Sequence, residues 1–283
     1  MNNFERASVL SEALPYIRAF TKKTVVVKYD GKAIQTEESK KAVISDIVLL
    51  SLVGVRVVVV HGGGPENDAV LKAMGKEQKL VEGKRYVDQE NMNVIQMTLA
   101  GKIGKDIVTM IADEGGKAFG FSGLDASLFT AKKSSGGADY GLVGEITTID
   151  PELVTVALDN GYIPVVAAIA RGEDADVNYD INADAAASEL AVKLGAEKLI
   201  LLTEACGIED EKGGVMSELY LSKVLPLIKK GVISGEMVHK VDCCVKAVRK
   251  GVPRAHILDG RLAHSVLVEM LTESGVGTMI LQD

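Results

Sequence analysis

Four consecutive valines followed by three consecutive glycines constrain the fold of this chain more than any other stretch. Val57–Val60 is branched throughout, which predicts a parallel strand buried on both faces. The glycines at 62–64 let the backbone turn sharply and present its N–H groups, and Pro65 suits the first turn of a helix. Because such N–H groups and the helix dipole favour negative charge, the segment predicts a phosphate or carboxylate site. A tight turn that binds nothing is the alternative.

A second short strand, Thr24–Lys28, ends in a lysine just before a turn at Gly31. A lysine at the end of a buried strand is costly unless it meets an anion. The carboxyl edge of a parallel sheet is where the sites of α/β proteins lie, so we expect Lys28 to face an anion there. A predicted helix over Ser39–Leu52 joins the two strands into a right-handed, parallel βαβ unit.

Composition restricts the class of protein. The 283 residues are 47% hydrophobic and 25% charged, with a net charge of −7, which predicts one large α/β domain or two lobes. The acidic balance argues against nucleic acid and against an anionic membrane as partners, and no apolar run approaches the roughly 20 residues of a membrane span. No signal-peptide pattern is present, and the three cysteines form no C-x-x-C motif, so we expect a reducing cytoplasm and neither disulfides nor structural zinc.

Three further segments have predictable structure. Residues 4–21 carry the stripe of an amphipathic helix that Pro15 should kink, and this helix either covers the sheet or docks on another subunit. Asp88 is predicted to cap a long helix that ends near Gly115. Residues 117–147 read as hairpins over the sheet edge.

Polar residues at two predicted helix starts point to a ligand. Asn182 and Asp184 precede a strong helix, where capping is the commoner use of such residues, but two acids and two asparagines within residues 178–184 exceed what a cap requires. Lys240 lies in the first turns of a helix that starts near Met237, which is unfavourable against the dipole unless a phosphate is nearby. Arg85 could clamp a carboxylate, although a solvated arginine is the default.

Taken in order, these motifs resemble the amino-acid kinase family over nearly the whole chain. The resemblance rests on the lysine-ended first strand and on residues 61–65, 83–85, 161–165, 182–184 and 234–235 before Lys240. Within the family, the N-terminal helix and the segments 256–261 and 275–278 resemble a hexameric branch that arginine inhibits.

The resemblance implies a three-layer αβα sandwich with a central, mostly parallel eight-stranded sheet. It implies a helical arm over residues 1–21 and a kinase domain over 22–283, with an acyl-amino-acid lobe (22–175) and a nucleotide lobe (176–283). The implied reaction moves the γ-phosphoryl group of ATP, with Mg²⁺ held through the nucleotide and no metal ligands from the protein, to the γ-carboxylate of N-acetyl-L-glutamate in arginine synthesis. L-arginine is the implied inhibitor, and the implied assembly is a homohexamer, a trimer of dimers.

The resemblance also implies residue roles. Lys28 and Lys240 would stabilise the charge of the transferring group, and Asp184 would position both lysines. The substrate would be held by Gly63, Gly64, Arg85, Asp180 and Asn182. The nucleotide would be held by Gly31, Thr203, Glu204, Gly207, Ile208, Ser234 and Gly235. Arginine would be held by Tyr16, His256, Glu269, Gly275 and Gly277, with Glu269 as a free carboxylate for the guanidinium.

Several positions depart from the family pattern. Asp30 and Glu236 stand where glycine is usual, Asp180 where asparagine is usual, Glu204 replaces an aspartate and Gly104 an asparagine. The first three acids add negative charge around an anion site, so they must point away, bind Mg²⁺, pair with Lys32 or Lys84, or weaken activity. Three alternatives stay open: a non-catalytic arginine sensor, a kinase for N-acetyl-2-aminoadipate, and a kinase for carbamate.

Overall fold

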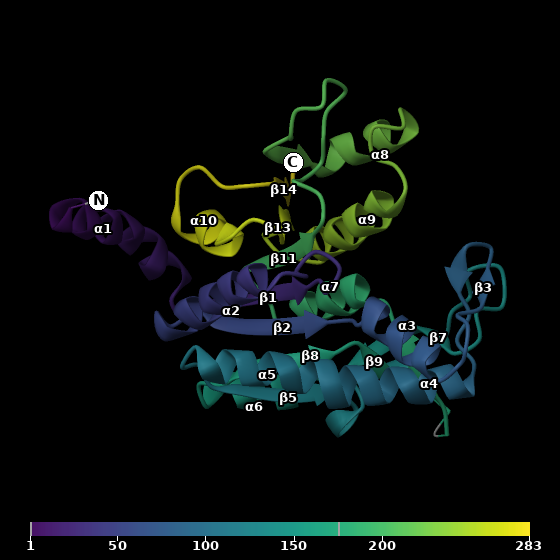
Figure 1. The fold of residues 1–283 in the computed structure, drawn as a ribbon. Helices are drawn as coiled ribbons and strands as arrows, with labels where there is room; N and C mark the ends of the chain where they lie inside the picture. The colour runs from purple at the N-terminus through teal and green to yellow at the C-terminus, as the bar shows by residue number, and fades with distance from the viewer. Residues whose placement is uncertain (1, 175) are drawn as a thin grey trace.

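The valine strand, β2 (Arg56–His61), lies near the middle of an eight-stranded sheet with the order β12-β14-β13-β11-β1-β2-β8-β5 (Figure 1). The structure is a computed structural model that describes residues 2–174 and 176–283. The other strands are β1 (Thr24–Tyr29), β5 (Ala118–Ser122), β8 (Ile163–Ala167), β11 (Lys198–Thr203), β12 (Glu218–Tyr220), β13 (Arg254–Asp259) and β14 (Thr278–Leu281). Only the β13–β14 pair within this sheet is antiparallel, so the predicted mostly parallel sheet is confirmed.

Alternating strand residues divide the core into two layers. Val26 and Val58 face one cluster of buried side chains, whereas Val25 and Val57 face the other. The first face is covered by α6 (Glu152–Asp159), α7 (Ala183–Lys193), α8 (Leu221–Lys229) and α9 (Glu236–Arg249). The second is covered by α2 (Glu37–Leu52), α4 (Gln89–Gln96), α5 (Gly104–Asp113) and α10 (Ser265–Leu271). Because both faces are covered, the central strand β2 is buried from Val57 to His61, as the valine run predicted.

The pairing of β1 with β2 brings two predicted turns to one edge of the sheet. Val25 pairs with Val57 and Tyr29 with His61 in parallel register, which confirms the βαβ unit. α3 (Gly64–Ala73) starts directly after β2 with Pro65 in its first turn. The turns that follow β1 and β2 therefore lie side by side at the carboxyl edge.

The prediction of hairpins over residues 117–147 was partly wrong. β5 pairs in parallel with β8 and forms the edge of the main sheet. Only β6 (Phe129–Lys133) and β7 (Val143–Ile149) form an antiparallel pair, and β9 (Ile169–Gly172) and β10 (Asn178–Ile181) complete a small closed barrel with them. A short, partly exposed edge strand carries no periodicity that distinguishes parallel from hairpin pairing. A separate two-stranded ribbon consists of β3 (Leu80–Val81) and β4 (Lys84–Arg85).

The long helix after Asp88 is present but is not uniform. The Asp88 side chain accepts a hydrogen bond from the Asn91 N–H, as a cap should. Between α4 and α5 the chain forms a π-helix, η1 (Met97–Ile103), which the sequence analysis did not predict. The next residue, Gly104, lies so close to the His61 ring that a Cβ there would be 3.3 Å from Nε2.

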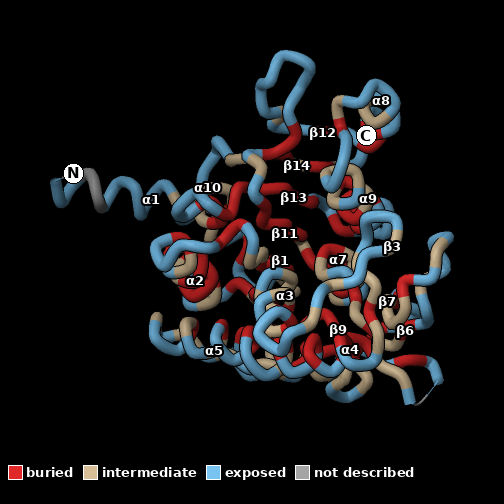
Figure 2. Tube along the Cα trace, turned by 45° about the vertical axis from the view of Figure 1, so that its right-hand side comes forward, coloured by how far each residue is buried: buried red, intermediate tan, exposed pale blue. Residues whose placement is uncertain are grey.

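The first helix, α1 (Asn3–Phe20), projects away from the sheet (Figures 1 and 2). Phe4, Leu10 and Leu14 are 89%, 74% and 44% exposed, whereas Phe20 at its end is buried. Most of this helix therefore does not cover the sheet of its own chain. Among residues 2–174 and 176–283, no helix is both long and apolar enough to cross a membrane.

Candidate active site

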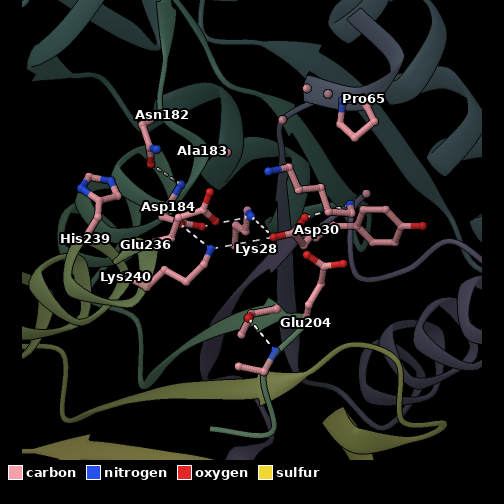
Figure 3. A pocket seen from close by; sticks show the side chains of 18 of the residues that line it. Lys28, Asp30, Pro65, Asn182, Ala183, Asp184, Glu204, Glu236, His239 and Lys240 are labelled. Atoms are coloured by element: carbon pink, nitrogen blue, oxygen red, sulfur yellow. Dashed lines mark hydrogen bonds and ion pairs between the residues drawn. The ribbon is translucent and has the colours of Figure 1, made fainter. Parts of the chain in front are cut away.

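The carboxyl edge of the sheet opens into a cavity of about 590 Å³ between the ends of β1, β2 and β11 and the starts of α3, α7 and α9 (Figure 3). Its wall includes the predicted site residues Lys28, Gly31, Gly63, Gly64, Asn182, Asp184, Thr203, Glu204 and Lys240. Residues from both halves of the chain thus converge on one cavity.

Two lysines meet one buried aspartate at the centre of this cavity. The Lys28 Nζ lies 3.1 Å from Asp184 Oδ1, and the Lys240 Nζ lies 2.9 Å from Asp184 Oδ2 (Figure 3). Asp184 follows the Asn182 cap, whose Oδ1 accepts the N–H groups of Asp184 and Ala185, so the start of α7 fixes its position. Asp184 therefore bridges the two ammonium groups, one on each carboxylate oxygen, and both lysines line the cavity.

The environment keeps Lys28 and Asp184 charged. Burial lowers the pKa of Lys28, but the carboxylates of Asp184 and Asp30 outweigh burial and raise this pKa above its ordinary value. Burial raises the pKa of Asp184, but Lys28 and Lys240 outweigh it and hold this pKa below its ordinary value. The cavity thus presents two ammonium groups, which suit an anionic ligand.

The glycine turn after β2 is closely packed by neighbouring side chains. A Cβ on Gly63 would lie 2.3 Å from Ile103 Cδ1, and a Cβ on Gly64 would lie 3.0 Å from the Arg85 guanidinium. The turn leads into α3, so its N–H groups lie at a helix N-terminus on the cavity wall. This is the geometry that the sequence predicted for an anion site.

Arg85 and Asp180 lie beyond this turn rather than in the cavity wall. The Arg85 Nη2 donates to Asp68 Oδ2 at 2.7 Å, and its guanidinium rests against Gly64. Burial raises the pKa of Asp180 to about 6, and the positive charge of Arg85 opposes this shift. A carboxylate ligand near Gly64 would therefore meet one arginine and one acid that titrates near neutrality.

The structure divides the predicted nucleotide residues. Gly31, Thr203 and Glu204 line the cavity, and Ser234 and Gly235 directly precede Glu236, which also lines it. Gly207 and Ile208 do not line this cavity and instead pack against Thr278, whose Oγ1 accepts the Ile208 N–H at 2.8 Å. Lys32, Met237 and His239 also line the cavity and were not predicted from the sequence. Their positions next to Gly31 and Lys240 were the available signal.

The structure also shows which partner Asp30 takes. Its Oδ2 accepts from the Lys28 Nζ at 2.7 Å. Its side-chain partner is therefore neither Lys32 nor Lys84, the pairings that were one of the alternatives left open from the sequence. Lys84 instead lies over the Tyr140 ring, 5.1 Å from its centroid. The sequence showed that Asp30 adds a negative charge but did not show its partner. The partner is set by the turn after β1, which directs Asp30 back toward Lys28 at the end of the strand.

Three of the predicted effector residues, His256, Glu269 and Gly275, gather near the opposite end of β11 and β13. Gly277 lies further along β13, and Glu269 was wrongly expected to be free. Its Oε1 lies 3.0 Å from His256 Nδ1 and 3.7 Å from Lys198 Nζ, and its Oε2 accepts the Val276 N–H. Lys198, at the buried start of β11, was not considered as a partner. Gly275 approaches Glu269 so closely that a Cβ would lie 2.3 Å from Oε2, and Gly277 has φ +81° with a Cβ position 2.3 Å from Ile257 O. Tyr16 lies half-buried on α1 against the core layer of α2.

We expect His61 to make the protein less stable in acid. Its ring is fully buried, and burial lowers its pKa to about 4, below the unfolded value of about 6.5. Stability from this group is complete above about pH 6.5 and is lost as the pH falls toward 4, which amounts to about 3 kcal/mol. His61→Asn keeps a donor for the Gly62 carbonyl, which the Nδ1–H now serves, and should flatten the pH dependence of urea unfolding over that window.

This experiment needs one control variant and one correction for a second titrating group. His239→Asn changes an exposed histidine and should keep the wild-type slope. Asp180 acts in the opposite sense, because its raised pKa adds stability below about pH 4 that is lost as the pH rises through about 6. Since all variants share that background, equal slopes for wild type and His61→Asn would contradict the role given to His61.

Comparison with known protein sequences gives full-length matches. A model described as the amino acid kinase family matches residues 23–259. The acetylglutamate kinase of Clostridium kluyveri is 47% identical over 283 residues, 99% of this chain and 100% of that protein. The acetylglutamate kinase of Heliobacterium modesticaldum is 48% identical over 291 residues, 98% of each chain.

Solved structures share the fold. N-acetylglutamate synthase from Neisseria gonorrhoeae, solved with coenzyme A and N-acetyl-glutamate, superposes with a TM-score of 0.86 at 27% identity; the match covers 98% of this chain but 63% of that longer chain. The same enzyme, solved with coenzyme A and L-arginine, gives a TM-score of 0.80 at 26% identity and covers 98% of this chain and 65% of that one. Giardia carbamate kinase superposes with a TM-score of 0.66 at 19% identity, and the match covers 92% of this chain and 99% of that one. This similarity shows a common fold alone.

Proposed function

Because this chain belongs to the amino acid kinase family, we propose that it transfers the γ-phosphoryl group of ATP to the γ-carboxylate of N-acetyl-L-glutamate. Acetylglutamate kinases match it at 47–48% identity over at least 98% of its length. It is thus a phosphotransferase with a carboxyl group as acceptor. The product is the acyl phosphate used in arginine synthesis.

The observation that carries the mechanism is the pair of lysines held by Asp184. Phosphoryl transfer depends on alignment and on stabilisation of the charge spread over the transferring group. Lys28 comes from β1 and Lys240 from α9, so the two ammonium groups approach the cavity from different elements. We assign them the stabilisation of that charge, and we assign Asp184 their positioning. A general base is unnecessary, because the attacking carboxylate is ionised near neutral pH.

The substrates are assigned to the two sides of the cavity. Gly63 and Gly64 would bind the acyl amino acid or the transferring group through N–H, with Arg85 beside Gly64 for the α-carboxylate. Asn182 offers its amide nitrogen, since its Oδ1 is used by the cap. Gly31, Thr203, Glu204, Ser234 and Gly235 would hold ATP. The kinase family implies ATP, and we propose Mg²⁺ bound through its phosphates, where it would neutralise their charge.

The test of this function is an ATP-dependent hydroxamate assay over a panel of carboxylates. N-acetyl-L-glutamate should be the preferred acceptor over N-acetyl-2-aminoadipate and carbamate. No turnover with any member would favour a non-catalytic arginine sensor, and preference for another member would replace the substrate but keep the reaction class.

We expect Asp180→Asn to strengthen binding of N-acetyl-L-glutamate. At pH 8 the ionised Asp180 repels a dicarboxylate next to Arg85, and the amide removes that repulsion. Because Asp180 is half-buried, we expect a modest fall in KM, roughly threefold to tenfold. The wild-type KM should fall as the pH drops through about 6, the pKa of Asp180, whereas the variant should not respond. KM for MgATP is the internal control and should not change. A higher KM in the variant would mean that Asp180 contributes to binding.

Regulation and assembly complete the proposal. We propose that L-arginine inhibits the enzyme at the cluster of His256, Glu269 and Gly275, and that α1 assembles the chain into a cytoplasmic homohexamer. The exposed apolar residues of α1 support the assembly. The close contact of Glu269 with Gly275 places a carboxylate beside a glycine turn, which supports the arginine site. The lobes proposed for substrate (22–175) and nucleotide (176–283) would open and close around the cavity.

A further inference from the structure

The carboxylate of Asp30 occupies the middle of the cavity (Figure 3). Its Oδ2 accepts from the Lys28 Nζ at 2.7 Å and lies 3.8 Å from the Lys240 Nζ. Its Oδ1 accepts the Lys32 N–H at 2.9 Å. Two ammonium groups and one backbone N–H therefore converge on a single carboxylate. These are the donors that bind a phosphate group in kinases.

The charges in the cavity show what this carboxylate does. Lys28, Lys240 and Asp184 alone carry one net positive charge, and their side chains are 6–14% exposed. Asp30, whose side chain is 13% exposed, brings the group to neutrality. Burying an unpaired charge is costly, so the carboxylate stabilises the cavity when no nucleotide is bound. An arriving phosphate must then compete with Asp30 for the same donors.

We propose that Asp30 is an internal substitute for a phosphate group, which the nucleotide displaces when it binds. The inference rests on the proposed function, because it concerns the same cavity and assigns Asp30 a role in nucleotide affinity. It also predicts selectivity. A small anion such as inorganic phosphate brings too few other contacts to displace Asp30, whereas ATP binds along the rest of the wall.

A metal ligand is the competing role for Asp30, and the geometry argues against it. Both oxygens already accept bonds from cationic or N–H donors, which a Mg²⁺ ion would have to replace. Within residues 2–174 and 176–283, no three side chains of His, Cys, Asp or Glu are grouped to hold a metal.

Asp30→Asn tests the proposal, because the amide oxygen keeps an acceptor for the Lys32 N–H, whereas the negative charge and the second acceptor, which faces the Lys28 Nζ, are removed. A non-hydrolysable ATP analogue with Mg²⁺ should bind at least about tenfold more tightly by calorimetry, and KM for MgATP should fall in parallel. We expect kcat to stay within about threefold. Inorganic phosphate, inert toward the wild type at millimolar concentration, should compete with the analogue in the variant.

The matched control is Glu236→Gln, which removes the same charge from the same wall. Glu236 is exposed at the start of α9, so its effect on binding should stay below about threefold. Equal shifts for both variants would mean a general electrostatic effect and would overturn the proposal. Unchanged binding of the analogue to Asp30→Asn would also overturn the proposal. Weaker binding would overturn it and would indicate that Asp30 is a ligand of the metal or of the nucleotide. The binding measurement needs no turnover. If Asp30→Asn binds the analogue more tightly but the wild type fails to phosphorylate N-acetyl-L-glutamate, the proposed substrate is refuted and this inference is not.

Discussion

Replacing Lys28 or Lys240 with alanine should lower kcat by roughly 10²–10³, the usual cost of losing one charge-stabilising contact in a water-excluded site. Both ammonium groups are held by Asp184 and point into the cavity where charge would develop. The hydroxamate assay gives kcat for each variant. Lys32→Ala is the matched control, because Lys32 lines the same wall but is exposed. We expect this substitution to lower kcat by less than tenfold.

Stability has to be separated from chemistry in this experiment. Lys28→Ala leaves Asp30 and Asp184 with one lysine between them, and an uncompensated buried charge can cost about 3–5 kcal/mol. The double variant Lys28→Ala/Asp30→Asn restores charge balance, so it should recover stability to urea but not turnover. Near-normal kcat in both single variants would contradict the catalytic assignment and favour the sensor.

The central sheet could be predicted because its signal is local. A run of branched residues such as Val57–Val60 specifies a strand apolar on both faces, and the glycines that follow specify a turn at the carboxyl edge. The parallel pairing of β1 with β2 followed from one intervening helix. Lys28 and the glycine turn were therefore placed in one cavity from sequence.

The features that could not be predicted depend on contacts between residues that are far apart in the sequence. β5 joins the sheet through β8, more than forty positions away, and no local pattern encodes that pairing. Glu269 was expected to be free because its partner Lys198 lies on another element, buried at the start of β11. For Asp30, sequence supplied the charge, and only the turn geometry supplied Lys28 as partner.

Removal of residues 1–14 should convert a hexamer into dimers and abolish most of the response to L-arginine. These residues include the exposed apolar side chains of Phe4, Leu10 and Leu14, which have no partner surface in the described part of the chain and suit a neighbouring subunit. The cut retains Tyr16 and Phe20, so the fold should survive. Light scattering would give the mass, and an arginine titration of kinase activity would give the inhibition constant.

The end of α1 connects the N-terminal helix to the proposed arginine site at His256, Glu269 and Gly275. The Lys198 Nζ lies 5.0 Å from the centroid of the Phe20 ring and 3.7 Å from Glu269 Oε1, so arginine bound at Glu269 would disturb the point where the arm joins the body. Such coupling is typically worth about 1–3 kcal/mol, or roughly fivefold to 150-fold in apparent affinity. Leu10→Gln/Leu14→Gln keeps the arm at full length and should reproduce the loss of assembly, which would assign it to the apolar face and not to chain length. A truncated protein that stays hexameric and arginine-sensitive would refute the role of the arm, whereas a full-length protein indifferent to millimolar arginine would refute the regulation and leave the kinase activity intact.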